Sequence, residues 1–292
     1  MITASVKQAK KLTRAGRATV TKPFRALKSL NPVRLLKERQ FPLKNFQTKV
    51  HVYQSSENFI LKTVENQFEL RQVLKLRHEI FFRELQNKEA ANQMDIDELD
   101  GVCDHLIIID KKTSKVVGTY RMISSTFSDS FYSEGEFDLT QVKKLPGNKL
   151  ELGRACIHAE YRSGAIINLL WKGIAEYIKK TDTKYLFGCA SVQTTDPVQA
   201  SRLQAYLRSE GLSVDDLGVA PTPAYRSELP PVEVTEGMAK EIPALVQSYI
   251  LAGAKFHGQP ALDRDFGCYD FFMMLKVDEM SRLFRRRYKI ED

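Results

Sequence analysis

The chain has 292 residues, of which 43% are hydrophobic, and a formal net charge of +8. This length is enough for one large domain with a buried core, and the composition excludes a disordered or fibrous protein. The longest aliphatic run is residues 106–109, far below the ~20 apolar residues that a membrane-spanning helix needs. The 4 cysteines lack metal-ligand spacing, so we expect reduced thiols rather than a zinc site or disulfides.

Most of the positive charge lies in residues 1–50, where thirteen lysines and arginines stand against Glu38 alone. Apolar residues recur among them at helical spacing, which is typical of amphipathic helices on an anionic membrane surface. Nucleic acid is the less favoured partner, because the segment has no aromatic platform beyond Phe24 and Phe41 and no binding motif. A solvated tail without a partner also stays open.

We therefore predict a basic N-terminal arm over residues 1–50 and a folded domain over 51–292, whose C-terminal extension begins at about residue 213. The N-terminus has no apolar core region and no small-residue cleavage site of a secretory signal. We expect a cytoplasmic protein that is peripheral at the inner membrane face.

After the arm, the pattern is that of a compact α/β domain. Apolar residues at three- and four-residue steps predict a helix over residues 65–85, capped by Thr63, with Arg77 inside the apolar stripe. The acidic stretch 86–104 lacks periodicity and predicts a loop. The other expected elements are strands at 59–64, 105–110, 116–124 and 149–157, a helix at about 167–178, a strand at 185–192, a helix at 197–209, a long connection over 213–240, a helix at about 242–253, and strands near 254–262 and 267–277.

Gly153 interrupts the expected strand 149–157. A glycine inside a strand often marks a bulge or a place where a ligand approaches the backbone. The hairpin at 105–124, followed by this strand, a helix, a strand and a helix, predicts a mixed, mostly antiparallel sheet flanked by helices. Fold alone does not give function.

An ordered series of short motifs runs along this domain. The motifs are Leu76-Arg77-His78-Glu79-Ile80-Phe81-Phe82, Asp97-Glu98-Leu99-Asp100, Val117-Gly118-Thr119-Tyr120-Arg121, Glu136-Phe137-Asp138-Leu139 and Glu151-Leu152-Gly153-Arg154. The series resembles the N-acyltransferases of ornithine-lipid synthesis, often labelled haemolysin-like, and is similar to the acyl-homoserine-lactone synthases. The resemblance covers residues 59–277 and implies an acetyltransferase-like (GNAT) fold. It also implies transfer of a (3-hydroxy)fatty acyl group from acyl carrier protein to the α-amine of ornithine, giving lyso-ornithine lipid.

Two departures from related patterns bear on substrate and donor. The tryptophan usual in lactone synthases soon after the first arginine is absent from residues 83–86. Synthesis of a lactone or of another N-acyl amino acid stays an alternative, as does a non-catalytic, membrane-binding haemolysin-like protein. The turn Arg162-Ser163-Gly164-Ala165 is too short for the coenzyme A phosphate loop of ordinary acetyltransferases. We therefore expect acyl carrier protein rather than acyl-CoA as donor, and no tightly bound cofactor or metal.

That turn opens a predicted helix, so its free backbone N–H groups could hold the phosphate of a pantetheine arm, with Arg162 assisting. Basic surface residues would dock the acidic carrier protein, and three candidates lie on the same helix. These candidates are Lys172, Lys179 and Lys180.

Direct attack of an amine on a thioester needs a proton acceptor, an oxyanion donor and positioning. Glu151 is the candidate acceptor, and a bulge at Gly153 would turn peptide N–H groups toward the thioester carbonyl. A salt bridge from Glu151 to Arg154 or Arg121 is the structural alternative.

Arg77, Arg121 and Arg154 lie on three separate expected elements. Together with Asp97 and Asp100 they could form a structural ion network, or they could hold the substrate carboxylate in a bidentate grip. We favour the structural role for Arg77 and Arg154 and leave Arg121 open.

The resemblance to the lactone synthases includes Phe81 in the same motif series and implies a substrate-binding role for it. Ornithine has a second ammonium group, which needs an acidic partner, and three neighbouring acids are candidates for it. These acids are Glu134, Glu136 and Asp138, with an ordinary solvated surface role as the alternative.

Overall fold

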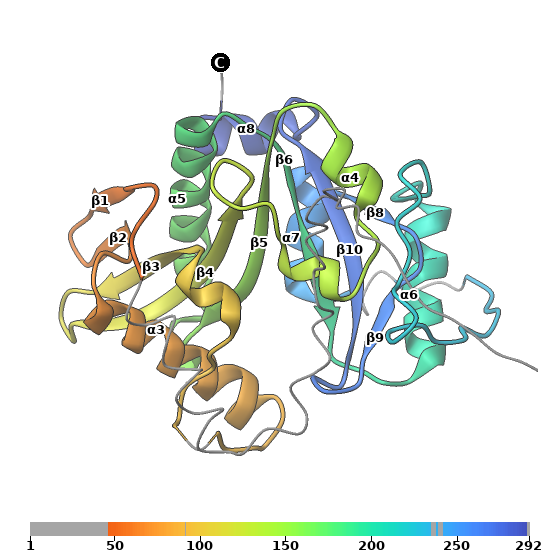
Figure 1. Ribbon diagram of the computed structural model, residues 1–292, viewed down its shortest axis with the longest axis horizontal. Coiled ribbons are helices and arrows are strands. Elements are labelled where there is room, and N and C mark those ends of the chain that lie inside the picture. Colours follow the sequence, from red (N-terminus) through yellow and green to blue (C-terminus); the bar gives the residue numbers. More distant parts are fainter. Residues whose placement is uncertain (1–45, 91, 235–237, 239–241, 291–292) are drawn as a thin grey trace, which may run out of the picture.

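The computed structural model describes residues 46–90, 92–234, 238 and 242–290 (Figure 1). All but the last five residues of the expected arm lie outside this range. Within it, no helix combines the length and apolar character needed to cross a membrane.

Strands β1 to β10 form one sheet. Their bounds are β1 Tyr53–Ser55, β2 Phe59–Thr63, β3 Asp104–Asp110, β4 Lys115–Ser124, β5 Asn148–Ile157, β6 Thr183–Val192, β7 Ser213–Val214, β8 Lys255–His257, β9 Ala261–Asp263 and β10 Cys268–Lys276. Over the described residues, the strand order is β1-β2-β3-β4-β5-β6-β10-β8-β7, with β9 paired to β10. Only β5–β6 and β7–β8 are parallel among these pairs. The prediction of a mixed, mostly antiparallel sheet is confirmed.

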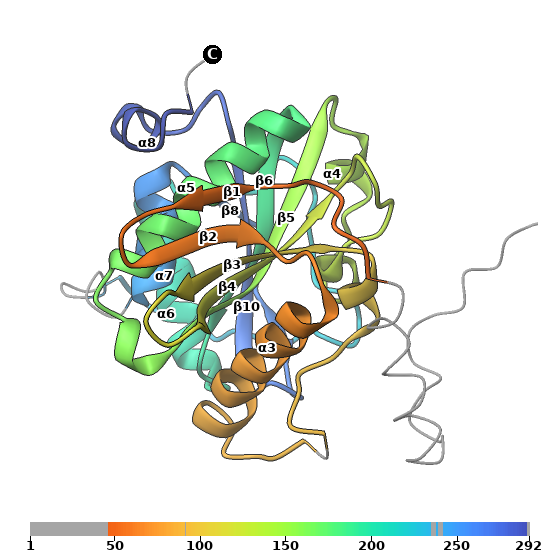
Figure 2. The same ribbon diagram turned by 90° about the vertical axis from the view of Figure 1, so that its left-hand side faces the viewer.

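Helices cover both faces of this sheet (Figure 2). The helical segments are α3 Gln67–His78, the π-helix η2 Glu79–Glu84, the 3-10 turns η3 Glu98–Gly101, η4 Tyr132–Gly135 and η5 Ala159–Tyr161, and the helices α4 Thr140–Lys144, α5 Ala165–Thr181, α6 Pro197–Ser209, α7 Ala244–Ala252 and α8 Arg282–Tyr288. On β3, Leu106 and Ile108 join the core cluster beneath α5, and Ile107 joins the cluster beneath α3. Because successive strand residues point to opposite faces, α3 and α5 lie on opposite sides of the sheet.

Several elements that the sequence predicted are present in the structure. The expected hairpin is the antiparallel pair β3–β4. The Asp196 side chain caps α6 by accepting from the Val198 N–H, with Pro197 at the first helical position. Residues 213–276 contribute β7 to β10, so this segment is built into the same sheet as the strands before it.

The expected helix over 65–85 needs correction at both ends. Thr63 is not its cap, because Thr63 ends β2 and its hydroxyl accepts from the Val52 N–H. Asn66 caps the helix instead, by accepting from the Glu69 N–H. At Glu79 the α-helix passes into the π-helix η2. The expected loop 86–104 contains the η3 turn, which Asp97 caps in a reciprocal capping box with Asp100.

The predicted interruption of β5 is a bulge. Thr119 of β4 lies opposite Cys156 and Arg121 opposite Gly153, so β5 carries one extra residue in this interval. Arg154, inside the interval, has a φ of 49°, a left-handed conformation that costs a non-glycine residue about 1–3 kcal/mol.

The parallel ladder between β5 and β6 is short. It ends at the pair Glu151–Phe187, and beyond this point β6 continues beside β10. Past Glu151, the edge of β5 that faces β6 therefore has no ladder partner among the described strands. Gly153 and Ala155 are partly exposed there, whereas Glu151 is buried.

Candidate active site

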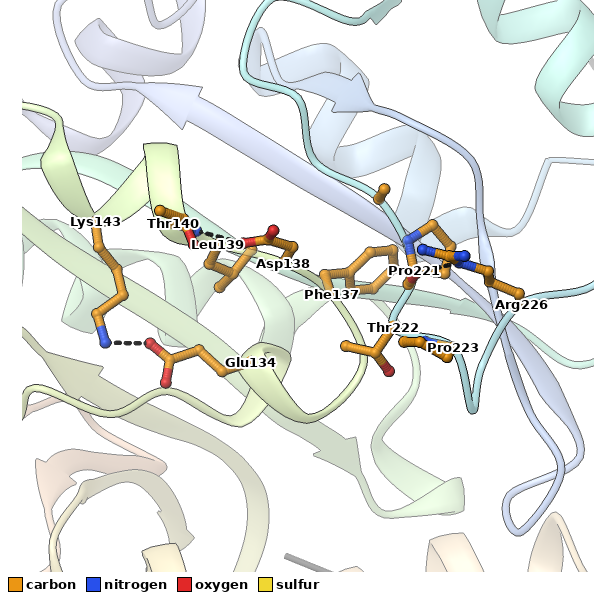
Figure 3. Close-up of a pocket in the computed structure, with 11 residues that line it drawn as sticks. Glu134, Phe137, Asp138, Leu139, Thr140, Lys143, Pro221, Thr222, Pro223 and Arg226 are labelled. Atoms are coloured by element: carbon orange, nitrogen blue, oxygen red, sulfur yellow. Dashed lines mark hydrogen bonds and ion pairs between the residues drawn. The ribbon is translucent and has the colours of Figure 1, made fainter. Parts of the chain in front are cut away.

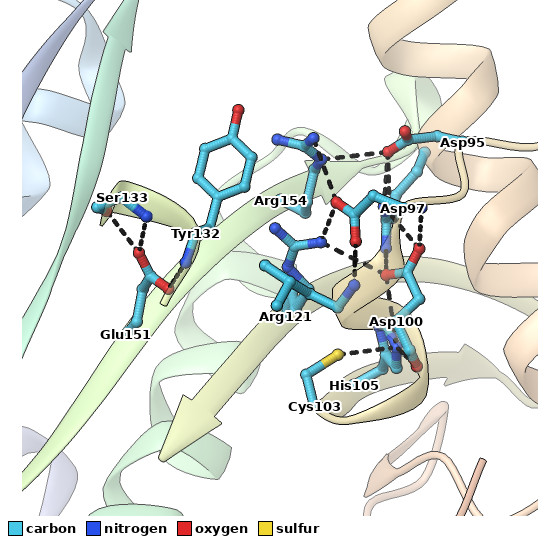
Figure 4. A network of polar contacts seen from close by, with 12 residues as sticks. Asp95, Asp97, Asp100, Cys103, His105, Arg121, Tyr132, Ser133, Glu151 and Arg154 are labelled. Atoms are coloured by element: carbon cyan, nitrogen blue, oxygen red, sulfur yellow. Dashed lines mark hydrogen bonds and ion pairs between the residues drawn. The ribbon is translucent and has the colours of Figure 1, made fainter. Parts of the chain in front are cut away.

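Arginines from separate elements meet the acidic loop that follows η2 (Figure 4). Arg77 of α3 donates to Asp95 at 2.8 Å and pairs with Asp100 at 2.5 Å. Arg121 of β4 pairs with Asp97, and with Asp100 at 3.5 Å. The side chains of Arg77 and Asp100 have no solvent exposure. Both are therefore structural members of the network, and direct contact of either with a substrate does not fit their burial.

Burial and charge act in opposite directions on these acids. Burial alone would raise the pKa of Asp97, but the guanidinium groups of Arg121 and Arg154 outweigh it and lower that pKa. The pKa of Asp95 is lowered in the same way by Arg77 and Arg154 against the effect of burial. Asp95 and Asp97 are therefore ionised and paired at neutral pH, whereas burial raises the pKa of Asp100.

Arg154 is the member of this network that lies at the bulge of β5. Its guanidinium pairs with Asp95 at 3.3 Å and with Asp97 at 3.5 Å. The guanidinium carbon also lies over three aromatic rings, those of Tyr132 at 4.6 Å, Phe266 at 4.9 Å and Phe81 at 5.7 Å. These contacts offset the backbone strain and fix a cation beside the open edge of β5.

The Glu151 carboxylate holds the η4 turn in place. Its Oε2 accepts from the Tyr132 N–H at 2.6 Å, and its Oε1 accepts from the N–H and the hydroxyl of Ser133 at 2.7 and 2.5 Å. Within the described residues no ion pair joins Glu151 to an arginine, so the salt-bridge alternative is wrong. Burial raises the pKa of Glu151, and the hydrogen bonds from Ser133 and Tyr132 counter part of this rise.

Glu136 belongs to a second group of acids, on the β6 side of the opening. Its Oε2 accepts from the Cys189 thiol at 3.5 Å. Asp270 of β10 accepts from the Ser191 hydroxyl at 2.5 Å. Burial, followed by the negative charges of Asp270 and Asp263, raises the pKa of Glu136 well above its usual value. Asp263 and Asp270 were missed from the sequence, because only the pairing of β9 with β10 and of β10 with β6 brings them here.

The other two acids considered for a second ammonium face elsewhere (Figure 3). Glu134 pairs with Lys143 at 2.5 Å, and Asp138 accepts from the Thr140 N–H at 2.9 Å. Both line a surface cavity of about 510 Å³ between α4 and residues 220–226. Of the three acids named from the sequence, only Glu136 belongs to the buried group.

The turn before α5 has the geometry of an open helix start. Gly164 is the N-cap residue, with a φ of 86° and no side-chain cap. Arg162 already has a partner, because its guanidinium pairs with the Glu84 carboxylate through contacts of 2.5 and 2.7 Å. The backbone N–H groups from Ala165 onward are thus the donors that this turn offers.

Comparisons with known proteins identify the family. A sequence model of the acetyltransferase (GNAT) domain matches residues 76–172. The chain is 31% identical over 234 residues to the L-ornithine Nα-acyltransferase of Brucella abortus (strain 2308), covering 74% of this chain and 83% of that protein. It is 30% identical over 235 residues to that of Rhodobacter capsulatus, covering 75% and 90%. This chain belongs to the L-ornithine Nα-acyltransferase family.

The family and the matched domain make this chain an amine-acylating enzyme of the acetyltransferase type, as the resemblance predicted. Among solved structures, it is similar to the CoA-dependent acyl-homoserine lactone synthase BjaI, with a TM-score of 0.43 and 14% identity over 77% of this chain and 84% of that one. It is also similar to FeeM, an N-acyl amino acid synthase from uncultured soil microbes, with a TM-score of 0.43 and 12% identity over 82% and 100%.

The range matched by the acetyltransferase domain contains every site residue named from the sequence, from Arg77 to Ala165. Asp263 and Asp270 of this L-ornithine Nα-acyltransferase family member lie outside it. The acidic group therefore combines one residue of the common domain with two from the C-terminal strands.

Proposed function

We propose that this enzyme transfers a (3-hydroxy)fatty acyl group from acyl carrier protein to the α-amine of ornithine, giving lyso-ornithine lipid. The observation that carries the proposal is the unpaired, bulged edge of β5 past Glu151, beside which both a fixed cation and a group of acids lie. Such a site fits an amino-acid acceptor, whose carboxylate and ammonium groups need opposite charges. The names of the relatives supply ornithine as the acceptor to test first.

The proposed reaction is a direct attack. The α-ammonium first gives a proton to Glu151 through a chain of water molecules, because the Glu151 carboxylate is buried and already accepts from Tyr132 and Ser133. The raised pKa of Glu151 makes its carboxylate a stronger base than a solvated one. The neutral amine attacks the thioester carbonyl carbon, and peptide N–H groups of β5 near Gly153 stabilise the negative charge on oxygen. The carbon–sulfur bond then breaks as the amide forms, the leaving thiolate takes one of the two protons on the attacking nitrogen, and the other proton stays on the amide.

Arg154 is the proposed contact for the acceptor carboxylate, with Phe81 packed against its guanidinium. Asp97 holds that guanidinium through an ion pair and is itself paired with Arg121. Arg77 and Asp100 act as positioning residues that fix the acidic loop.

The carrier protein is proposed to dock on basic surface. Lys172 and Lys179 line a cavity of about 350 Å³ together with Arg287 and Lys289, whereas Lys180 pairs with Glu176 at 3.6 Å. An acidic carrier is attracted to such a face at long range. The open turn of residues 162–165, at the start of the same helix, is the proposed phosphate site.

The decisive assay incubates purified protein with a 3-hydroxyacyl carrier protein or the same acyl-CoA, and with ornithine, lysine, homoserine or glycine. We expect N-acylornithine, detected by mass spectrometry, and faster turnover with the carrier protein. Absence of any acylated amino acid would refute the function, and a product formed only from homoserine would move the enzyme to the lactone-synthase class.

We further propose that the basic arm holds the enzyme at an anionic membrane. Co-sedimentation with phosphatidylglycerol vesicles tests this for the full chain and for a variant lacking residues 1–44. Unchanged binding of the shortened chain would show that the arm is not the anchor.

A further inference from the structure

The buried acids Glu136, Asp263 and Asp270, which we call the acidic cluster, lack a balancing cation. No lysine or arginine in the described part of the chain forms an ion pair with any of them. The nearby network differs in this respect, because its three acids meet three arginines. Since burial of unpaired carboxylates opposes folding, an acidic cluster without a cation needs another explanation.

Glu136 also has an unused oxygen. Its Oε1 is buried and makes no hydrogen bond of standard geometry among the described residues, although Oε2 accepts from the Cys189 thiol and the carboxyl group interacts with the Tyr132 hydroxyl and the Asp270 carboxyl. The Glu136 side chain is nearly inaccessible, at 2% exposure. A buried acceptor without a donor is uncommon in folded proteins, and one at a binding site is ready to accept from a ligand.

The acidic cluster adjoins the open edge of β5. Phe187 is the last residue of β6 that pairs with β5. Cys189 comes two positions later and therefore points to the same face of the sheet. Ser191, the next residue on that face, contacts Asp270 and is exposed. The exposed Ser191 side chain therefore connects the surface of β6 with the acidic cluster.

Tyr132 lies between the two charged groups. Its ring packs under the Arg154 guanidinium, with 4.6 Å between the guanidinium carbon and the ring centre. The charge of Arg154 lowers the pKa of the Tyr132 hydroxyl, and the charge of Glu136 raises it. A cation and a group of buried acids without a cationic partner thus lie on either side of one tyrosine. This is the charge pattern that an amino acid with a carboxylate at one end and an ammonium at the other would match.

We infer that the acidic cluster binds the side-chain ammonium of a diamino-acid acceptor, with Glu136 and Asp270 as its direct partners. The inference rests on the proposed function and identifies what selects the acceptor. An ammonium group supplies both the missing positive charge and a hydrogen-bond donor for Glu136 Oε1. The site therefore discriminates ornithine from norvaline, which has the same carbon chain without the terminal amine.

A metal ion is the competing occupant, since Glu136, Cys189 and Asp270 offer ligand atoms within 4.8 Å of one another. Burial, followed by the charges of Glu136 and Asp270, raises the pKa of the Cys189 thiol well above its usual value. The protonated thiol is a poor metal ligand and a weak hydrogen-bond donor, and it donates to Glu136 here. The chemistry favours the ammonium group.

The test compares kcat/KM for ornithine and for norvaline in the wild type and in Glu136→Gln, with the same acyl donor. We expect the ornithine-to-norvaline ratio to fall by about 10- to 100-fold in the variant, because a charge-assisted hydrogen bond is lost. Asp270→Asn should change the ratio in the same direction. Glu134→Gln, on the outer side of the same turn, is the matched control and should leave the ratio unchanged.

The ratio does not depend on how much of each preparation is folded, because both substrates are measured with the same enzyme. An equal loss for ornithine and norvaline in Glu136→Gln would overturn the inference and leave the proposed function standing. Wild-type enzyme that acylates neither amino acid would instead refute the proposed function. Loss of the preference after dialysis against EDTA would assign the acidic cluster to a metal ion and overturn the inference.

Discussion

Gly153→Ala separates the role of the β5 backbone in catalysis from its role in folding. A Cβ built on Gly153 meets nothing within 4 Å, and this glycine does not have a left-handed φ. Alanine should therefore fit, and it should stabilise the fold by about 0.4–1 kcal/mol because it restricts the unfolded chain. The new methyl group would occupy the space where the mechanism places the thioester.

The expected loss of activity follows from that geometry. A methyl group beside the peptide donors would move the reacting carbonyl by about 1 Å, and a displacement of this size costs about a hundredfold in rate. This corresponds to about 2.7 kcal/mol of transition-state stabilisation. We expect kcat/KM to fall by this factor while the free energy of unfolding in urea stays equal or rises.

Gly188→Ala is the contrasting variant on the facing strand. A Cβ there would lie 2.3 Å from the Leu152 carbonyl oxygen, where β5 and β6 part. This contact is impossible without backbone movement, so we expect loss of stability and activity together. Wild-type kcat/KM in a folded Gly153→Ala enzyme would refute the placement of the thioester against β5.

Other substitutions test the polar contacts. Glu151→Gln turns an amide N–H₂ toward a backbone donor. We expect the free energy of unfolding, measured by urea titration, to fall by about 1–3 kcal/mol. Unchanged stability would contradict the anchoring of Tyr132 by Glu151. Arg154→Lys keeps the positive charge but loses the stacking of the planar guanidinium on the Tyr132 ring. We expect the free energy of unfolding to fall by about 1–2 kcal/mol in the same assay. An unchanged value would show that this stacking does not stabilise the fold. The pKa values of Glu136 and Asp270 are raised, so the folded enzyme binds more protons than the unfolded chain, and unfolding free energy should fall as the pH rises above about 4.5. Glu136→Gln should make the free energy of unfolding decrease less steeply with pH. An unchanged slope would contradict the raised pKa of Glu136.

Sequence reasoning succeeded where the signal was local. The bulge of β5 was predictable because a glycine inside an apolar strand is a local irregularity, and the cap of α6 because Asp196 and Pro197 are adjacent. The Arg154 conformation was not predictable, since the left-handed residue is the arginine and not the neighbouring glycine. Its strain depends on ion pairs and ring contacts with residues distant in the chain.

The partners of the acids were the part that the sequence could not supply. A salt bridge from Glu151 to Arg154 or Arg121 was the structural alternative to its role as proton acceptor. The η4 turn, 18 residues earlier in the chain, provides backbone donors to Glu151 instead. Acidic residues look alike in a sequence whether they are paired, solvated or buried without a partner. Only the strand order, which places β10 against β6, separates the balanced network from the acidic cluster.

This difference bears on how an acceptor is selected. If every buried acid met an arginine, the site would present no net charge to a second ammonium group and would have no electrostatic means to prefer a diamino acid. In the acidic cluster, burial raises the pKa values of Glu136 and Asp270 and disfavours their ionised forms. A bound ammonium group favours those ionised forms, and this contribution to binding is unavailable to amino acids with apolar side chains. An enzyme built in this way trades stability of the empty site for discrimination between acceptors.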